Sequence, residues 1–276
     1  MPGNADDPVR RDGRLTAMPL FWLCLSAFAA GAVNSVAGGG TLLSFPTLVW
    51  VLGGTAEAAV IANATSTVAL LPGSLASMGG YRREFVGTGR WIRWLMAPSL
   101  AGGMVGSLLL VMLDPESFRR LVPWLILTAT LLFLLQPTIA QWTGIGQAHS
   151  EPTRGMMLGI VAFQFLVAVY GGYFGAGIGI LMLSALSMMG IGDIHQMNAL
   201  KSLFGTGINL LAAIVFVISN QVEWRYAAPM TVAAILGGYF GAHFARRLDK
   251  RVVRAMVIAI GFTLATYYFA RIYFGV

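Results

Sequence analysis

The sequence predicts an all-α membrane protein that crosses the bilayer many times and is built from two copies of one unit. Three observations lead to this prediction. Of the 276 residues, 57% are hydrophobic and only 11% are charged, whereas an ordinary soluble domain carries about a quarter charged residues. Apolar stretches of near-membrane length recur along the chain, and a glycine-rich stretch in the first half has a counterpart in the second. We therefore expect a polytopic helical bundle within the lipid bilayer.

Eight apolar stretches approach the roughly 20 residues of helix that cross a hydrocarbon core about 30 Å thick. They lie at about 17–36, 58–80, 94–113, 121–140, 155–174, 203–219, 226–245 and 252–274. Two shorter pieces, 41–53 and 178–191, would cover only about 20 Å as helix, so we expect half-length or broken helices there. The polar tail at 1–16 and the first stretch together also fit a secretory signal peptide. The glycines that come directly after the first stretch recur in the second half of the chain, which argues against a signal peptide.

The two halves of the chain carry the same series of landmarks. The string "AGGGTLL" at 37–43 matches "AGIGILM" at 176–182, an offset of 139 residues. Three later pairs share an offset of 135 residues: Asn63 with Asn198, "GGMVG" (102–106) with "GGYFG" (237–241), and Asp114 with Asp249. The change of offset falls in a loop, where length differences are tolerated. We therefore predict transmembrane repeat 1 at 17–140, a linker at 141–154 and transmembrane repeat 2 at 155–276.

Arginine and lysine set the expected orientation, because cytoplasmic loops are enriched in them. The loops at 81–93 and 246–254 hold four and five such residues, and both should be cytoplasmic. Because they occupy different steps of the repeat, the two repeats would be inverted, with five crossings each when the short pieces are counted. The N-terminal arginines would then lie outside, which counts against this arrangement. The alternative is parallel repeats with four full crossings each and re-entrant short pieces.

Glycines interrupt the apolar pattern at matching places in the two halves: Gly38, Gly39 and Gly40 in the first, and Gly175, Gly177 and Gly179 in the second. In lipid, a broken helix is tolerated only where it is buried in protein or lines a polar cavity. A helix that restarts after a break offers free N–H groups and the positive end of its dipole, which favour an anion. We expect these breaks to bind substrate near the membrane midplane, as in secondary transporters. Close helix packing is the alternative, and we favour it for Gly102, Gly106, Gly237 and Gly241.

A lysine lies well inside an apolar stretch. The strings "NATST" (63–67) and "NALKS" (198–202) open the helix that follows each short piece. Lys201 has Ser66 as its repeat equivalent, and an intramembrane lysine is by default a functional candidate. The alternative is that Lys201 reaches the membrane interface with its charged end. Besides the six glycines of the breaks, we predict that the substrate is bound by Asn34, Ser35, Thr41, Asn63, Thr65, Ser66, Asn198, Lys201 and Ser202.

At these residues the sequence resembles the TauE/SafE family of sulfite exporters and related permeases. The resemblance extends from about residue 17 to 273 and rests on the glycine stretch after the first helix, the repeat, and the "NALKS" string. It implies an inverted-repeat carrier in the bacterial inner membrane that exports a small organosulfur anion, such as sulfite or a sulfonate like sulfoacetate. The matching string "NATST" in the first half has no lysine.

Other function classes fit the sequence less well. The three histidines are scattered and the lone Cys24 has no paired base in view, so we expect no enzyme, and no metal or other cofactor. The net charge of +7 resides in short loops between helices, which argues against nucleic acid. An anion channel, or a carrier of another small carboxylate or inorganic anion, is the alternative function. The expected partners are the substrate anion and the lipid bilayer, and the sequence leaves open a coupling proton or ion and a homodimer.

Overall fold

The computed structural model describes residues 17–36, 39–142, 153–189, 191, 193–244 and 250–275. Over these residues the regular structure is entirely helical, as predicted, with ten α-helices and a π-helical turn. In chain order the elements are α1 (Ala17–Val36), α2 (Thr41–Val51), α3 (Ala56–Gly80), α4 (Gly89–Met112), α5 (Pro115–Trp142), α6 (Arg154–Tyr173), α7 (Ile178–Ser187), α8 (Ile194–Ile218), α9 (Trp224–Phe244), α10 (Lys250–Phe269) and the π-helical η1 (Ala270–Phe274).

Six of the described helices are long and apolar enough to cross a membrane: α3, α4, α5, α6, α8, and α10 continued by η1. The sequence predicted eight full-length spans. The remaining two, α1 and α9, are helical over 20 and 21 residues, but their described residues do not meet the same requirement of length and hydropathy. Three helices begin at least five residues earlier than predicted, α4 at Gly89, α5 at Pro115 and α8 at Ile194, because their first turns contain polar residues and lie outside the apolar pattern.

The two short helices follow the glycine breaks, as the sequence predicted. Helix α2 has 11 residues and α7 has 10. Gly39 precedes α2 with φ of 98°, and Gly177 caps α7 with φ of 79°. Residues with a β-carbon rarely adopt this left-handed region. Glycine at these two positions therefore allows the chain to turn sharply and restart a helix.

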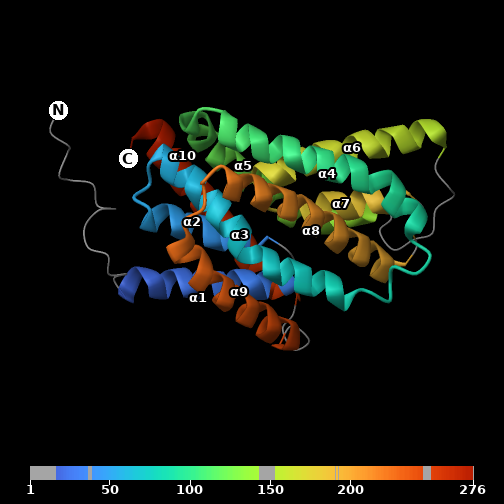
Figure 1. The fold of residues 1–276 in the computed structure, drawn as a ribbon, viewed down its shortest axis with the longest axis horizontal. Coiled ribbons are helices and arrows are strands. Elements are labelled where there is room, and N and C mark those ends of the chain that lie inside the picture. The colour runs from blue at the N-terminus through green and yellow to red at the C-terminus, as the bar shows by residue number, and fades with distance from the viewer. Residues whose placement is uncertain are drawn as a thin grey trace.

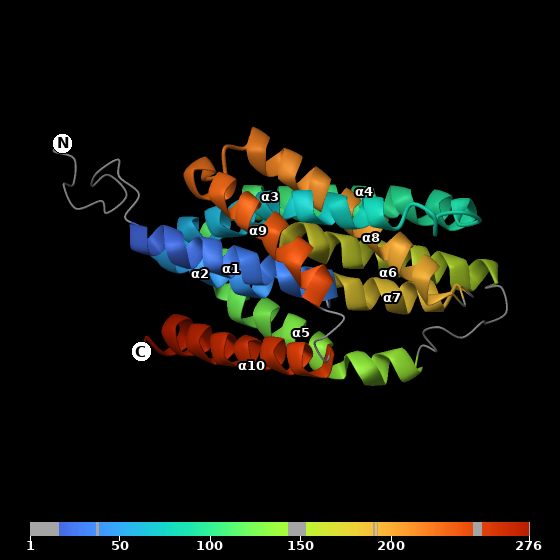
Figure 2. The ribbon, with the colours of Figure 1, turned by 90° about the horizontal axis from the view of Figure 1, so that it is seen from below.

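Helices from the two halves pack against one another in matching pairs (Figure 1). Helix α1 packs on α9, which slants across it, α4 packs on α6, α5 lies along α10, and α3 crosses α8. Figures 1 and 2 show α1 running from left to right along the long axis and α6 running from right to left. Each half thus contributes helices to one shared bundle rather than forming a lobe of its own.

Glycines on α4 and α9 allow two of these helix pairs to approach closely. A β-carbon at Gly102 or Gly106 would meet the backbone of α6 at Phe165 or Val169, and one at Gly237 would meet the carbonyl of Phe28 in α1. The packing interpretation is therefore confirmed for these three positions. The surroundings of Gly241 lie outside the described side chains.

An aromatic cluster packs α2 and α5 against the second break. The ring of Phe45 in α2 meets Phe118 in α5 and Phe174 edge-on, with centroid distances of 6.3 and 5.4 Å. Phe118 in turn meets Tyr173, the last residue of α6, at 5.4 Å. Phe45, Phe118 and Phe174 are fully buried. Such edge-to-face contacts between buried rings are favourable, and here they hold the end of α6 beside the first repeat.

Candidate substrate site

The first break is closed by a local cap. The N–H of Gly40 donates to Asn34 Oδ1 at 2.7 Å, and the N–H of Leu42 donates to the carbonyl of Gly39 at 3.0 Å. Asn34 thus satisfies one of the free N–H groups at the start of α2. A β-carbon at Gly39 would overlap the ring of Phe133 in α5. The space beside Gly39 is therefore filled by Phe133 and is not left open for a ligand.

Ser66 is tied to the first turn of α2. Its hydroxyl lies 2.6 Å from the hydroxyl of Ser44, which also donates to the carbonyl of Gly40 at 3.3 Å. Ser66 and Ser44 are both fully buried, and Thr41 beside them is half-buried. Two predicted residues, Ser66 and Gly40, are thus brought together through Ser44, which the sequence analysis did not single out. Ser44 follows Gly40 by four residues, about one helical turn, and this spacing was the signal in the sequence that could have identified it.

Lys201 lies over the first turn of α7. A β-carbon built at Gly179 would be 3.3 Å from Lys201 Cδ, so the missing side chain leaves room for the lysine. Lys201 is half-buried and forms no hydrogen bond or ion pair with the described residues. Within the same part of the chain, the N–H groups of Ile178 and Gly179 meet no acceptor. The structure thus joins two predicted residues, Lys201 and Gly179, at a helix start with free donors.

Asn63 connects the first repeat to the second break. Its side chain is 1% exposed, and its Nδ2 donates to the carbonyl of Tyr173 at 3.1 Å. The Asn63 Oδ1 atom is buried and has no hydrogen-bond partner among the described residues. A buried acceptor without a partner is uncommon in folded proteins. Asn63 therefore has spare hydrogen-bonding capacity beside the break at Gly175.

The remaining predicted residues are placed less directly. Thr65 accepts a hydrogen bond at 3.0 Å from the N–H of Glu223, which precedes α9, so it fixes the α8–α9 connection. Asn198 donates to the carbonyl of Ile194 in its own helix at 2.9 Å, and Ser202 is half-buried. A β-carbon at Gly177 would lie 3.5 Å from Ala129 in α5. Gly38 and the side chain of Ser35 lie outside the described residues.

The sequence analysis missed a tyrosine that bridges the second break. The hydroxyl of Tyr170 in α6 donates to the carbonyl of Ala176 at 2.9 Å, and so spans the residues around Gly175. A tyrosine in an apolar helix usually needs a partner for its hydroxyl, which was the signal available. No cluster of three histidine, cysteine or acidic side chains that could hold a metal occurs in the part of the chain that the structure describes.

Comparison with known proteins matches residues 23–268 to the family model described as sulfite exporter TauE/SafE. The chain belongs to this family. The TauE/SafE match starts in α1 and ends in α10, so both glycine breaks and Lys201 lie within it. With six helices capable of crossing a membrane, this TauE/SafE protein is a multi-pass membrane transporter.

Curated relatives of this TauE/SafE protein carry transporter names. A "Probable membrane transporter protein" of Haemophilus influenzae is 25% identical over 238 residues, 86% of this chain and 89% of the relative. The "Probable membrane transporter protein ORF9" of Sinorhizobium sp is 25% identical over 89% of this chain and 90% of its own length. YfcA of Escherichia coli, also named a probable membrane transporter protein, is 25% identical over 85% of this chain and 83% of its own length. No solved structure matches the chain.

Proposed function

We propose that this transporter is a secondary carrier that exports a small organosulfur anion, such as sulfite or a sulfonate like sulfoacetate. The observation that supports this most is Lys201, which lies over Gly179 at the start of α7 without a counter-charge among the described residues. The family description supplies the direction of transport and the sulfur chemistry.

An anion inside the bundle needs compensating positive charge, because burying an unpaired charge is prohibitive. Lys201 supplies a full positive charge, and the free N–H groups of Ile178 and Gly179 supply aligned donors and the positive end of the α7 dipole. A sulfite or sulfonate group carries three oxygens that accept hydrogen bonds. In this proposal the anion bridges the Lys201 ammonium and the first turn of α7.

The two repeats would contribute unequal halves of the site. Ser66, the repeat equivalent of Lys201, contacts Ser44 and the first turn of α2, so the first repeat offers neutral hydrogen bonds where the second offers charge. The unpartnered Oδ1 of Asn63 lies next to the second break. The proposed set is completed by the glycines of the two breaks and by Asn34, Ser35, Thr41, Thr65, Asn198 and Ser202. These residues either contact the anion or shape the backbone around it.

We further propose that the repeats are inverted, with five crossings each, and that they rock against each other around the site. Two observations support this. The packing of α1 on α9 corresponds to that of α6 on α4, and α1 and α6 run in opposite directions in Figures 1 and 2. The α3–α4 connection lies at the right of Figure 1, and α9 runs from the left toward that side before the second basic loop. In this proposal both basic loops face the cytoplasm of a bacterial inner membrane.

Flux through reconstituted protein tests this function. Proteoliposomes are loaded with sulfite, sulfoacetate, taurine, sulfate or acetate, and efflux and counterflow are measured with and without a proton gradient. We expect saturable flux and counterflow with sulfite or sulfoacetate. Large uncoupled currents without counterflow would identify a channel, preference for acetate or sulfate would identify a different anion, and no flux with any of the five compounds would contradict the proposal.

A further inference from the structure

A small pocket lies at the end of the bundle where the chain's C-terminus is found. It forms where the α2–α3 turn, the start of α5 and the η1 turn meet, and its polar lining comes from Thr55, Arg119, Tyr268 and Arg271. The pocket shares no residue with the candidate substrate site. A π-helical turn such as η1, which holds Arg271, is often found at functional sites.

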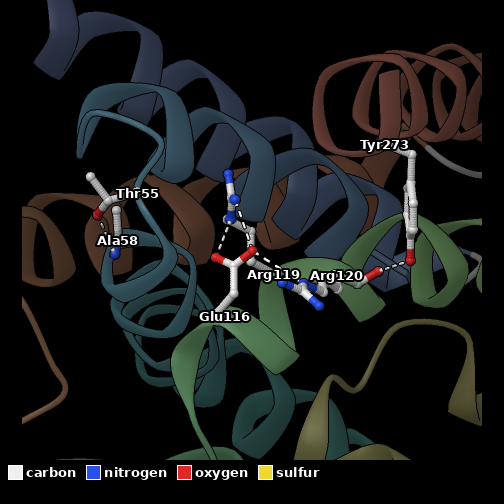
Figure 3. Close-up of polar contacts among 6 residues, drawn as sticks. All are labelled: Thr55, Ala58, Glu116, Arg119, Arg120 and Tyr273. Atoms are coloured by element: carbon white, nitrogen blue, oxygen red, sulfur yellow. Dashed lines mark hydrogen bonds and ion pairs between the residues drawn. The ribbon is translucent and has the colours of Figure 1, made fainter. Parts of the chain in front are cut away.

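The pocket carries an excess of positive charge. Figure 3 shows Glu116 accepting hydrogen bonds from Arg119, at 2.7 and 2.8 Å, and from Arg120, at 3.3 Å. Arg271 donates instead to the neutral hydroxyl of Tyr267 at 3.0 Å, and no carboxylate pairs with it among the described residues. Three arginines and one glutamate leave this group with a net charge of +2.

Several donors around the pocket remain available to a ligand. Arg119 uses Nε and Nη2 for Glu116, which leaves Nη1. The hydroxyl oxygen of Thr55 accepts from the N–H of Ala58 at 3.1 Å, so its O–H is free to donate. A β-carbon at Gly54, where φ is 70°, would lie 3.0 Å from Arg271 Nη2, so glycine leaves room for this guanidinium beside the turn. Guanidinium groups bind oxyanions through two parallel hydrogen bonds.

We propose that this pocket is a second anion site, which binds a small oxyanion such as sulfite at the mouth between Arg119 and Arg271. The choice of anion rests on the proposed function. The enclosed part of the pocket, about 10 Å³, has room for about one water molecule, so the anion lies against the ends of the arginine side chains. In the proposed topology this end faces outward, so the site would hold the exported anion after its release.

Binding of radiolabelled sulfite to purified full-length protein, followed by scintillation proximity, tests the second site. We expect two binding components in the unsubstituted protein. Lys201→Ala should weaken one component by about 10- to 100-fold and leave the other unchanged. Adding Arg271→Gln should weaken the remaining component by about 10- to 100-fold, because hydrogen bonds from a charged donor are lost. Arg271→Lys should weaken it less, since the charge is kept but the fork geometry is not.

Arg225→Gln is the matched control, because Arg225 is an exposed arginine at the start of α9 that does not line the pocket. This variant should leave both components unchanged. A single component that disappears entirely in Lys201→Ala would overturn the second site, as would unchanged sulfite binding in both Arg271 variants. Failure of the proposed function is recognised separately, by absent flux in proteoliposomes while the Arg271-dependent component persists.

Discussion

At the scale of single residues, Lys201 is the position where charge and burial conflict most clearly. Its aliphatic chain passes over Gly179, and its ammonium has no partner among the described residues. A charged group inside a membrane bundle is costly unless it is paired or hydrated. We attribute the conflict to the substrate, which would supply the missing negative charge during transport.

Lys201→Ala should therefore weaken substrate binding by about 10- to 100-fold, the effect of losing a hydrogen bond to a charged group. Lys201→Arg should keep part of the affinity, because charge survives while the compact ammonium does not. The measurement is calorimetric titration of purified protein with sulfite or sulfoacetate. Thr263→Ala is the control, since Thr263 bonds to the carbonyl of Ala259 in its own helix, α10, and lies outside the candidate site. Equal affinity in Lys201→Ala and the unsubstituted protein would mean that the lysine only reaches the interface.

A second residue-scale prediction concerns the space that Gly179 leaves for Lys201. Gly179→Ala introduces a methyl group about 3.3 Å from Lys201 Cδ, which is tighter than an ordinary van der Waals contact, so the lysine must shift. We expect lower substrate affinity with little loss of thermal stability, since Gly179 lies within α7 and alanine favours a helix. Gly205→Ala, whose β-carbon would meet no atom within 4 Å, is the control on α8. Unchanged substrate affinity in Gly179→Ala would show that Gly179 does not contribute to the substrate site.

At the scale of elements, the two glycine breaks are made differently. The first is packed by Phe133 against Gly39, and Asn34 caps the helix that follows. The second is bridged by the Tyr170 hydroxyl, and its helix start keeps free N–H groups. The shared glycine pattern indicated two breaks of one kind. The side chains that pack around them make the second the better place for an anion.

Gly39→Ala should destabilise the protein more than Gly53→Ala. Both positions have positive φ, 98° and 89°, and forcing alanine into this region costs about 1 kcal/mol. At Gly53 a β-carbon meets no atom within 4 Å, whereas at Gly39 it overlaps the Phe133 ring, which adds about 1 to 3 kcal/mol of overpacking.

Thermal unfolding in detergent measures the difference between the two glycine variants. In Gly39→Ala combined with Phe133→Ala, the loss of stability should be smaller than the sum of the two single losses, because the clash is removed. Additive losses would show that the ring and the glycine are not coupled.

At the scale of the whole molecule, the proposed inversion makes a prediction about sidedness. Single cysteines at positions 86 and 249, in a Cys24→Ala background, should be protected from an impermeant thiol reagent added to intact cells. A cysteine at Asn220, an exposed residue after α8, should be labelled, because it lies at the other end of the bundle. Labelling of only one of positions 86 and 249 would remove the case for inverted repeats.

The sequence by itself determined the membrane environment, the helical class, the two short helices and the pairing of Lys201 with Ser66 by repeat position. These follow from composition, span length and glycine conformation, which act within a few residues of the chain. Only the tertiary structure decided that Phe133 fills the space beside Gly39, that Asn63 reaches Tyr173, and that Arg119 and Arg271 meet across a pocket. These pairs are about 90 to 150 positions apart in the chain, and they depend on how distant helices pack, which no local pattern records.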